Sequence, residues 1–117
     1  ITNMPPEIAA SRSDSVIGEV PIPYVSPFQL PLYSTPQFTF GKGFIIRGVN
    51  SLLRRRVPFT YELHSLDVAC EERDGIDPGL RKIPQMRVDL KKRSADFEEI
   101  FTIMKNEADV VPITELV

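Results

Sequence analysis

Apolar positions recur with helical spacing in two places, and each place predicts an amphipathic helix. In the first, Ile45, Val49, Leu52 and Leu53 return every three or four residues, and Pro58 ends the pattern. In the second, apolar residues stand at i, i+3, i+4 and i+7: Phe97, Ile100, Phe101 and Met104. Ser94 is the predicted N-cap of the second helix, because its hydroxyl can accept a hydrogen bond from a first-turn amide.

Three other stretches have the apolar density that is typical of β-strands: 15–20, 59–66 and 110–113. Helices that separate apolar strands along a chain are typical of parallel β/α units. The predicted fold class is therefore α/β, as one segment covering 1–117, with an irregular lead-in over 1–14 and β/α units over 15–117. Two or three strands do not close a barrel, so we expect the sheet to be incomplete in this chain.

Proline is concentrated at the start of the chain, where seven of the eleven prolines lie within the first 36 residues. Proline lacks an N–H group and fixes φ, so this third should hold neither a long helix nor a central strand. Residues 23–40 are nevertheless rich in apolar and aromatic side chains, which disordered linkers lack. They are predicted to form a long loop that is functional or packs against something.

Composition narrows the class of partner. The formal net charge of −2 gives no electrostatic reason to expect nucleic acid or an anionic membrane as a partner. The basic run at 54–56 is interpreted as a cationic helix end. No apolar run approaches the roughly 20 residues of a membrane span, and no secretory leader is recognisable. Cys70 is the only cysteine and is compatible with a reducing compartment, which favours the cytoplasm without settling the localisation.

His64 is the only histidine, and it stands near the C-terminal end of the predicted strand 59–66. Side chains alternate along a strand, so Thr60, Glu62 and His64 share a polar face, while residues 59, 61 and 63 can pack under helices. Two interpretations stay open: an ordinary polar residue at a strand end, or half of a chemical site whose other half lies elsewhere. Asp67, three positions later, is interpreted as a loop residue.

The common catalytic motifs are absent from the sequence. It has no glycine-rich phosphate loop, no nucleophile elbow and no HExxH helix. One histidine and one cysteine do not complete a zinc site. Catalysis by this chain alone is therefore not expected.

A series of short motifs nevertheless resembles the carboxy-terminal part of a polysaccharide deacetylase domain, of the NodB-homology or carbohydrate esterase family 4 type. In order they are GEVPI, LPLYSTPQFTFGKG, YELH, an acidic loop with a proline, and VVPITEL after the last helix. In that family the last barrel strand ends in an apolar-x-Leu-His pattern, which residues 61–64 match. The closing helix leads into a phrase like FVTLSEL, which residues 110–116 resemble. The likeness spans about residues 15–117.

The resemblance implies a distorted β/α barrel that removes N-acetyl or N-formyl groups from amino sugars or polysaccharides. It also implies a divalent metal, usually zinc, held by an Asp and two His of earlier motifs, with a second Asp as general base. His64 would be the general acid that protonates the leaving amine. Glu19 would orient His64, and the aromatic loop 24–40 would flank the sugar cleft.

This chain departs from the family pattern because the TFDDG and HxxxH motifs are missing, so it cannot assemble the metal site alone. With Ile1 in place of an initiator Met, this predicts a piece of a split or truncated hydrolase that is inactive by itself. Such a piece would depend on the missing N-terminal half of the domain or on self-association. The alternatives are a small non-catalytic α/β module that binds a partner through its aromatic loop, or an inactive remnant.

Overall fold

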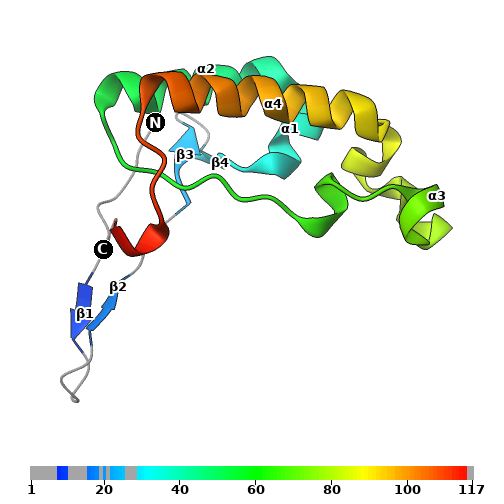
Figure 1. The fold of residues 1–117 in the computed structure, drawn as a ribbon, viewed down its shortest axis with the longest axis horizontal. Coiled ribbons are helices and arrows are strands. Elements are labelled where there is room, and N and C mark those ends of the chain that lie inside the picture. The colour runs from blue at the N-terminus through cyan, green and yellow to red at the C-terminus, as the bar shows by residue number, and fades with distance from the viewer. Residues whose placement is uncertain (1–7, 11–15, 19, 21, 26–28, 116–117) are drawn as a thin grey trace.

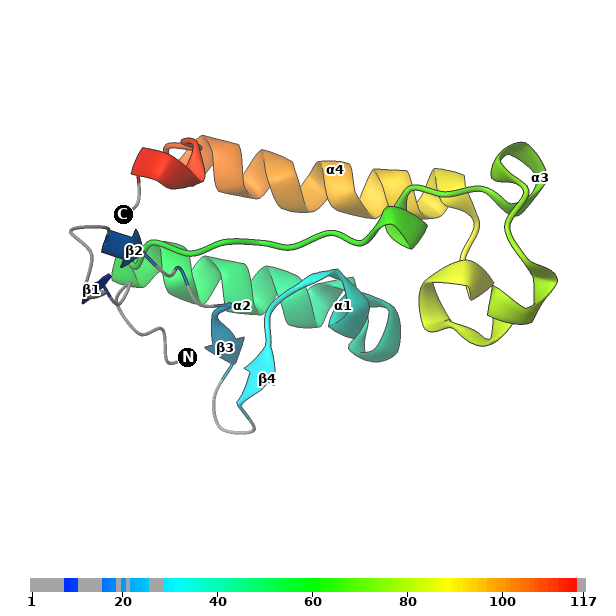
Figure 2. The ribbon, with the colours of Figure 1, turned by 90° about the horizontal axis from the view of Figure 1, so that it is seen from below.

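Two long helices packed side by side form the body of the molecule (Figures 1 and 2). The computed structural model describes residues 8–10, 16–18, 20, 22–25 and 29–115. The helices are α1 (Ser34–Phe40), α2 (Lys42–Arg55), α3 (Glu71–Asp74) and α4 (Leu90–Glu107). The strands are β1 (Ile8–Ala10), β2 (Val16–Gly18), β3 (Tyr24–Val25) and β4 (Leu30–Pro31). Short 3-10 turns complete the order: η1 (Ser65–Asp67), η2 (Pro78–Lys82), η3 (Pro84–Arg87) and η4 (Ile113–Glu115).

The core lies between α2 and α4 and consists of a few aliphatic side chains with no exposed surface. Its members are Leu32, Ile45, Val49, Leu52 and Ile100. Three of them stand on one face of α2, as the helical spacing predicts. The first helix prediction is therefore confirmed, including its cationic end, since residues 54 and 55 occupy the last turn of α2.

α4 begins earlier than the apolar stripe indicates. It starts at Leu90, and its N-cap is Asp89, whose Oδ1 accepts the Lys92 N–H at 3.0 Å. The predicted N-cap Ser94 lies inside the helix. The start was missed because the first turn carries polar and charged residues, whereas the pattern records only the turns that bury apolar side chains.

The predicted long loop 23–40 contains the strands β3 and β4 and the helix α1, so that prediction is wrong over these elements. α1 follows the β3–β4 hairpin, and Phe38 on α1 packs edge-on against Phe97 of α4, with ring centroids 5.9 Å apart. Gly41 separates α1 from α2 with φ 88°, a backbone conformation that side chains rarely tolerate. Its N–H donates to the Gln37 carbonyl at 2.9 Å and closes α1.

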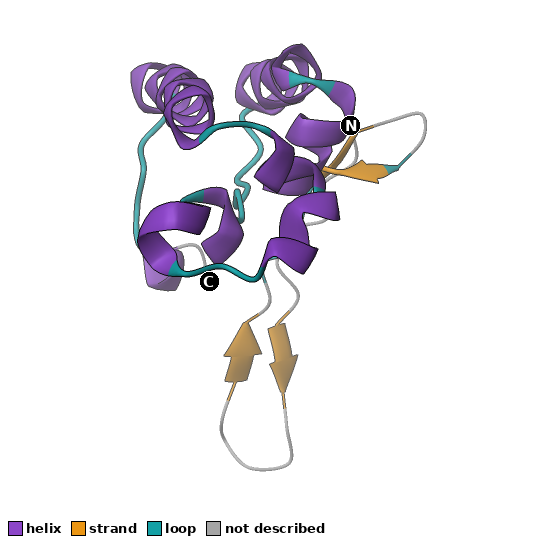
Figure 3. Cartoon of the chain, turned by 90° about the vertical axis from the view of Figure 1, so that its right-hand side faces the viewer, coloured by secondary structure: helices purple, strands orange, loops and turns teal. Residues whose placement is uncertain are grey.

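The α/β fold class, as the carboxy-terminal portion of a NodB-like β/α barrel, is contradicted. The described residues form a mostly helical small globule with four helices, and their strands make only two antiparallel two-stranded hairpins. One hairpin pairs β1 with β2, so strand 15–20 is confirmed in part and the lead-in 1–14 is not wholly irregular. Figures 1 and 3 show this hairpin projecting from the helical body.

The reason for this error is visible in residues 57–64, which run extended alongside α2 and α4 and lie between the two helices in the view of Figure 2. Phe59 and Tyr61 pack against the core, as the predicted alternation requires, and Val57 packs there too. Leu63, the third residue predicted to pack, is instead 43% exposed. The segment nevertheless belongs to no sheet among the described strands. The pattern of residues favours an extended backbone, but a sheet also needs a hydrogen-bonded neighbour. The predicted strand 110–113 likewise has no strand partner among the described residues and passes into η4.

Truncation of the core should show how much of the stability depends on the α2–α4 contact. Ile100→Ala should lower the free energy of unfolding by about 2–5 kcal/mol, because it leaves a cavity in a fully buried site. Ile113→Ala is the matched control, since Ile113 is 57% exposed and should lose less than about 0.5 kcal/mol. Urea denaturation followed by circular dichroism measures both changes. Equal losses for the two variants would contradict the position of the core.

Candidate active site

His64 ends the extended segment and stands immediately before the turn η1. Its side chain is exposed, and its ring makes a T-shaped contact with the ring of Tyr33, with centroids 5.7 Å apart. Tyr33 directly precedes α1, so two segments that are distant in sequence form this contact. Glu62 is exposed too, as predicted for the polar face of the segment.

The main chain of His64 is held in place although its side chain is exposed. The His64 N–H donates to Asp67 Oδ2 at 2.6 Å, and the Asp67 N–H donates to the His64 carbonyl at 2.9 Å. The Asp67 side chain has no exposed surface. The imidazole is therefore accessible but stands on a backbone that is fixed by reciprocal hydrogen bonds, an arrangement like a helix capping box.

Arg93 of α4 also holds this turn, through hydrogen bonds to its main chain. It is 2% exposed, and its guanidinium donates to four main-chain carbonyls. Nη1 reaches the carbonyls of Leu66 at 2.6 Å and Asp67 at 2.9 Å, and Nη2 reaches that of Ala69 at 2.6 Å. Nε donates to the Val88 carbonyl at 2.9 Å. Residues 64–69, held in this way, are called the His64 turn below.

Two residues of α1 form hydrogen bonds with the extended segment. The Ser34 N–H donates to the Glu62 carbonyl at 3.1 Å, and the Tyr61 hydroxyl donates to Gln37 Oε1 at 3.2 Å. Burial raises the pKa of Tyr61 well above its usual range, and the negative charge of Asp67 raises it further. The phenol therefore remains a neutral hydrogen-bond donor.

Four buried polar atoms near this turn have no hydrogen-bond partner within the described structure: Ser34 Oγ, Gln37 Nε2, Asp67 Oδ1 and Gln85 Oε1. They lie on α1, η1 and η3, and η3 packs against both of the others. Unpaired buried polar groups are costly, and when they gather they mark places where packing is not the only constraint. These atoms are therefore a group of unpaired polar positions on three elements around the His64 turn.

The sequence singles out His64, whose role stays a prediction, but it does not indicate the residues that hold its main chain. Asp67, predicted as a loop residue, lies in the turn η1, fully buried and bonded to His64. The three-residue offset between them is that of a capping pair, which could have indicated the bond. Arg93 gave no signal, because a basic residue early in a helix is ordinary in a sequence. Glu19, the predicted partner of His64, lies outside the described residues, and that pairing stays a prediction.

The described residues do not fit a zinc site. No group of three or more His, Cys, Asp or Glu side chains among them could hold a metal ion. The nearby carboxylates are engaged with cations instead: Glu71 pairs with Arg81, and Asp74 with Arg73. The Arg73 hydrogen bond, helped by the Cys70 N–H, lowers the pKa of Asp74 to about 2.

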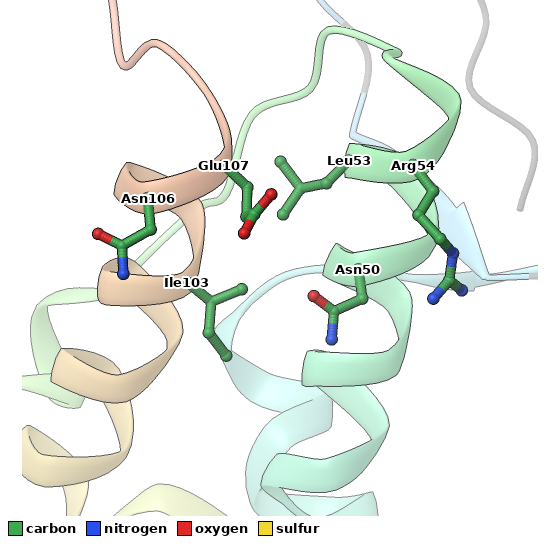
Figure 4. A pocket seen from close by; sticks show the side chains of 6 residues that line it. All are labelled: Asn50, Leu53, Arg54, Ile103, Asn106 and Glu107. Atoms are coloured by element: carbon green, nitrogen blue, oxygen red, sulfur yellow. The ribbon is translucent and has the colours of Figure 1, made fainter.

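Two hollows flank the α2–α4 contact away from His64. The larger is an open groove of about 1210 Å³ between the extended segment and the chain after α4, lined mainly by apolar side chains such as Phe59, Phe101, Met104 and Val111. The smaller, about 330 Å³, lies between α2 and α4. Figure 4 shows Asn50 and Leu53 of α2 facing Ile103 and Glu107 of α4 there. It contains no His or Cys among its lining residues.

Comparison with protein-family models, curated proteins and solved structures found no match to this chain. None of the described helices is long and apolar enough to cross a membrane.

The buried phenol of Tyr61 predicts a loss of stability at alkaline pH. The folded protein keeps a proton that the unfolded chain releases above about pH 10, so the free energy of unfolding should fall as the pH rises past that value. Tyr61→Phe should remove this loss, at a cost of about 1 kcal/mol near neutrality for the hydrogen bond to Gln37.

Urea midpoints measured at roughly pH 8 and pH 11 test this expectation. Tyr24→Phe is the matched control, because Tyr24 is 44% exposed, and this variant should behave like the unaltered chain. An alkaline loss that persists in Tyr61→Phe would show that another group causes it.

Proposed function

We propose that this chain carries the proton-donating part of a hydrolase that removes N-acetyl or N-formyl groups from amino sugars, with His64 as the general acid. The observation that carries the proposal is the presentation of His64: an exposed imidazole on an immobilised main chain. A general acid must reach the substrate and also be held in a fixed position. The order of the YELH and VVPITEL motifs supports the same reaction class.

The chemical step assigned to His64 is donation of one proton. Water adds to the amide carbonyl carbon, the C–N bond breaks, and its electron pair goes to the nitrogen. An amine leaves poorly unless that nitrogen is protonated, so the imidazolium gives up its proton to it. The products are the free amino sugar and acetate or formate. Tyr33, which packs against the ring, limits the directions from which a substrate can approach.

The metal and the general base of such a reaction have to come from elsewhere. The described residues hold no set of metal ligands, so no step of the reaction is assigned to a metal here. The backbone of the extended segment supports the need for a further polypeptide segment. The N–H groups of Phe59, Thr60 and Leu63 have no hydrogen-bond partner within the described structure. Open N–H groups on an extended backbone can pair with a neighbouring strand.

A non-catalytic binding module is the second candidate, favoured by the apolar groove beside the extended segment. The groove is open and mainly apolar and lies beside the extended segment, so an extended peptide is the occupant that this candidate assigns to it. Val110 and Ile113 on its rim are 78% and 57% exposed. In this candidate His64 would have no chemical role, which separates the two functions experimentally.

Deacetylation by the assembled protein tests the first candidate. The chain is combined with the polypeptide that supplies the metal ligands, zinc is added, and acetate released from N-acetylglucosamine oligomers is measured. His64→Gln should lower kcat about 10²–10⁴-fold, because the substituted side chain cannot donate a proton in the same way. Glu62→Gln is the matched control on the same face of the segment and should keep most of the activity.

An undiminished rate with His64→Gln would remove the role assigned to the imidazole. Absence of acetate release from the assembled protein, with the groove still binding an extended peptide, would favour the binding module.

A further inference from the structure

We propose that Arg93 is a positioning residue, which sets the place and direction of the His64 imidazole by fixing the carbonyls of the His64 turn. The inference rests on the proposed function only for what His64 does with its proton. Whether Arg93 fixes the turn is a separate question, and it is answered by measurements on the turn itself.

The surroundings of Arg93 are unfavourable for a cation unless the N–H groups of its guanidinium donate hydrogen bonds. The side chain is 2% exposed and lies in the first turn of α4, at the positive end of the helix dipole. It makes no ion pair with any described carboxylate. A buried charge in such a place is stable only when hydrogen bonds replace the water it has lost.

The replacement comes almost entirely from one turn. Three of the four carbonyls that Arg93 bonds belong to residues 66, 67 and 69, and the fourth, Val88, lies just before α4. A guanidinium presents its donors in a rigid planar fork, so it holds these carbonyls in one arrangement. A lysine has a single nitrogen on a flexible stem and cannot reproduce that arrangement.

Asp67 transmits this constraint to His64. Its carbonyl is held by Arg93, and its carboxylate holds the His64 N–H at 2.6 Å. Arg73 is a poor substitute, because it reaches the Val68 carbonyl from an exposed position while paired with Asp74.

Amide and guanidinium hydrogen exchange, followed by nuclear magnetic resonance, test the proposal on the chain itself. In the unaltered chain the Arg93 Nε–H should exchange at least about tenfold more slowly than that of Arg87, which is exposed. Arg93→Lys should speed exchange of the His64 amide roughly tenfold and shift its ring signals, since contact with Tyr33 is loosened. In the same variant the amide exchange rates of Val49 and Ile100 in the core should change less than about twofold. Arg87→Lys is the matched control and should change exchange neither in the core nor in the His64 turn.

Asp67→Asn keeps the test decisive if Arg93→Lys does not fold. It should speed exchange of the His64 amide several-fold while the Arg93 Nε–H stays protected. Equal exchange at the Nε–H of Arg93 and Arg87, or an unchanged His64 amide in the folded variants, would overturn the proposal.

The assembled enzyme supplies the functional readout. Arg93→Lys should lower kcat by up to about 10²-fold with KM nearly unchanged, as expected when a catalytic group is misplaced and substrate binding is not. An equal change in both constants would mean a general structural role and would count against positioning. An unchanged deacetylation rate in His64→Gln would contradict the proposed function. Hydrogen exchange at the His64 amide and the Arg93 Nε–H would still decide the role of Arg93.

Discussion

The contact between α2 and α4 is the constraint on which the rest of this structure depends. A few aliphatic side chains with no exposed surface join the two helices, and Lys42 of α2 adds a salt bridge to Asp96 of α4 at 3.5 Å. The extended segment 57–64 lies on this pair of helices and takes its direction from it. A chain of this size has one such core and little else to stabilise it.

The candidate site is built outward from that core in successive steps. Ile100 anchors α4, and α4 places Arg93 under the His64 turn. The His64 turn positions Asp67, and the Asp67 carboxylate fixes the main chain of His64. Buried polar groups of this kind contribute little net stability but are specific in geometry. The position of the exposed His64 is therefore fixed by Arg93 and Asp67, which are buried.

Sequence patterns predicted local structure well where burial alone decides it, and failed where a distant partner decides it. The helix around Ile45 and Val49 and the buried face of α4 followed from spacing. Phe59 and Tyr61 pack inward as the alternation requires, yet their segment lies in no described sheet, because pairing depends on another segment. Arg93 was invisible in the sequence, since its partners are main-chain carbonyls, which every residue carries.

The open N–H groups of residues 59, 60 and 63 in the extended segment have a consequence for how this chain behaves in concentrated solution. Open extended segments can stack on one another between molecules and nucleate fibrils. Two neighbours work against this stacking: Pro58 has no N–H to offer, and Glu62 sets like charges facing each other in an in-register stack. These two residues do not block the N–H groups between them, which can still pair with a strand from a specific partner. Pro58 and Glu62 therefore oppose fibril formation without preventing specific strand pairing.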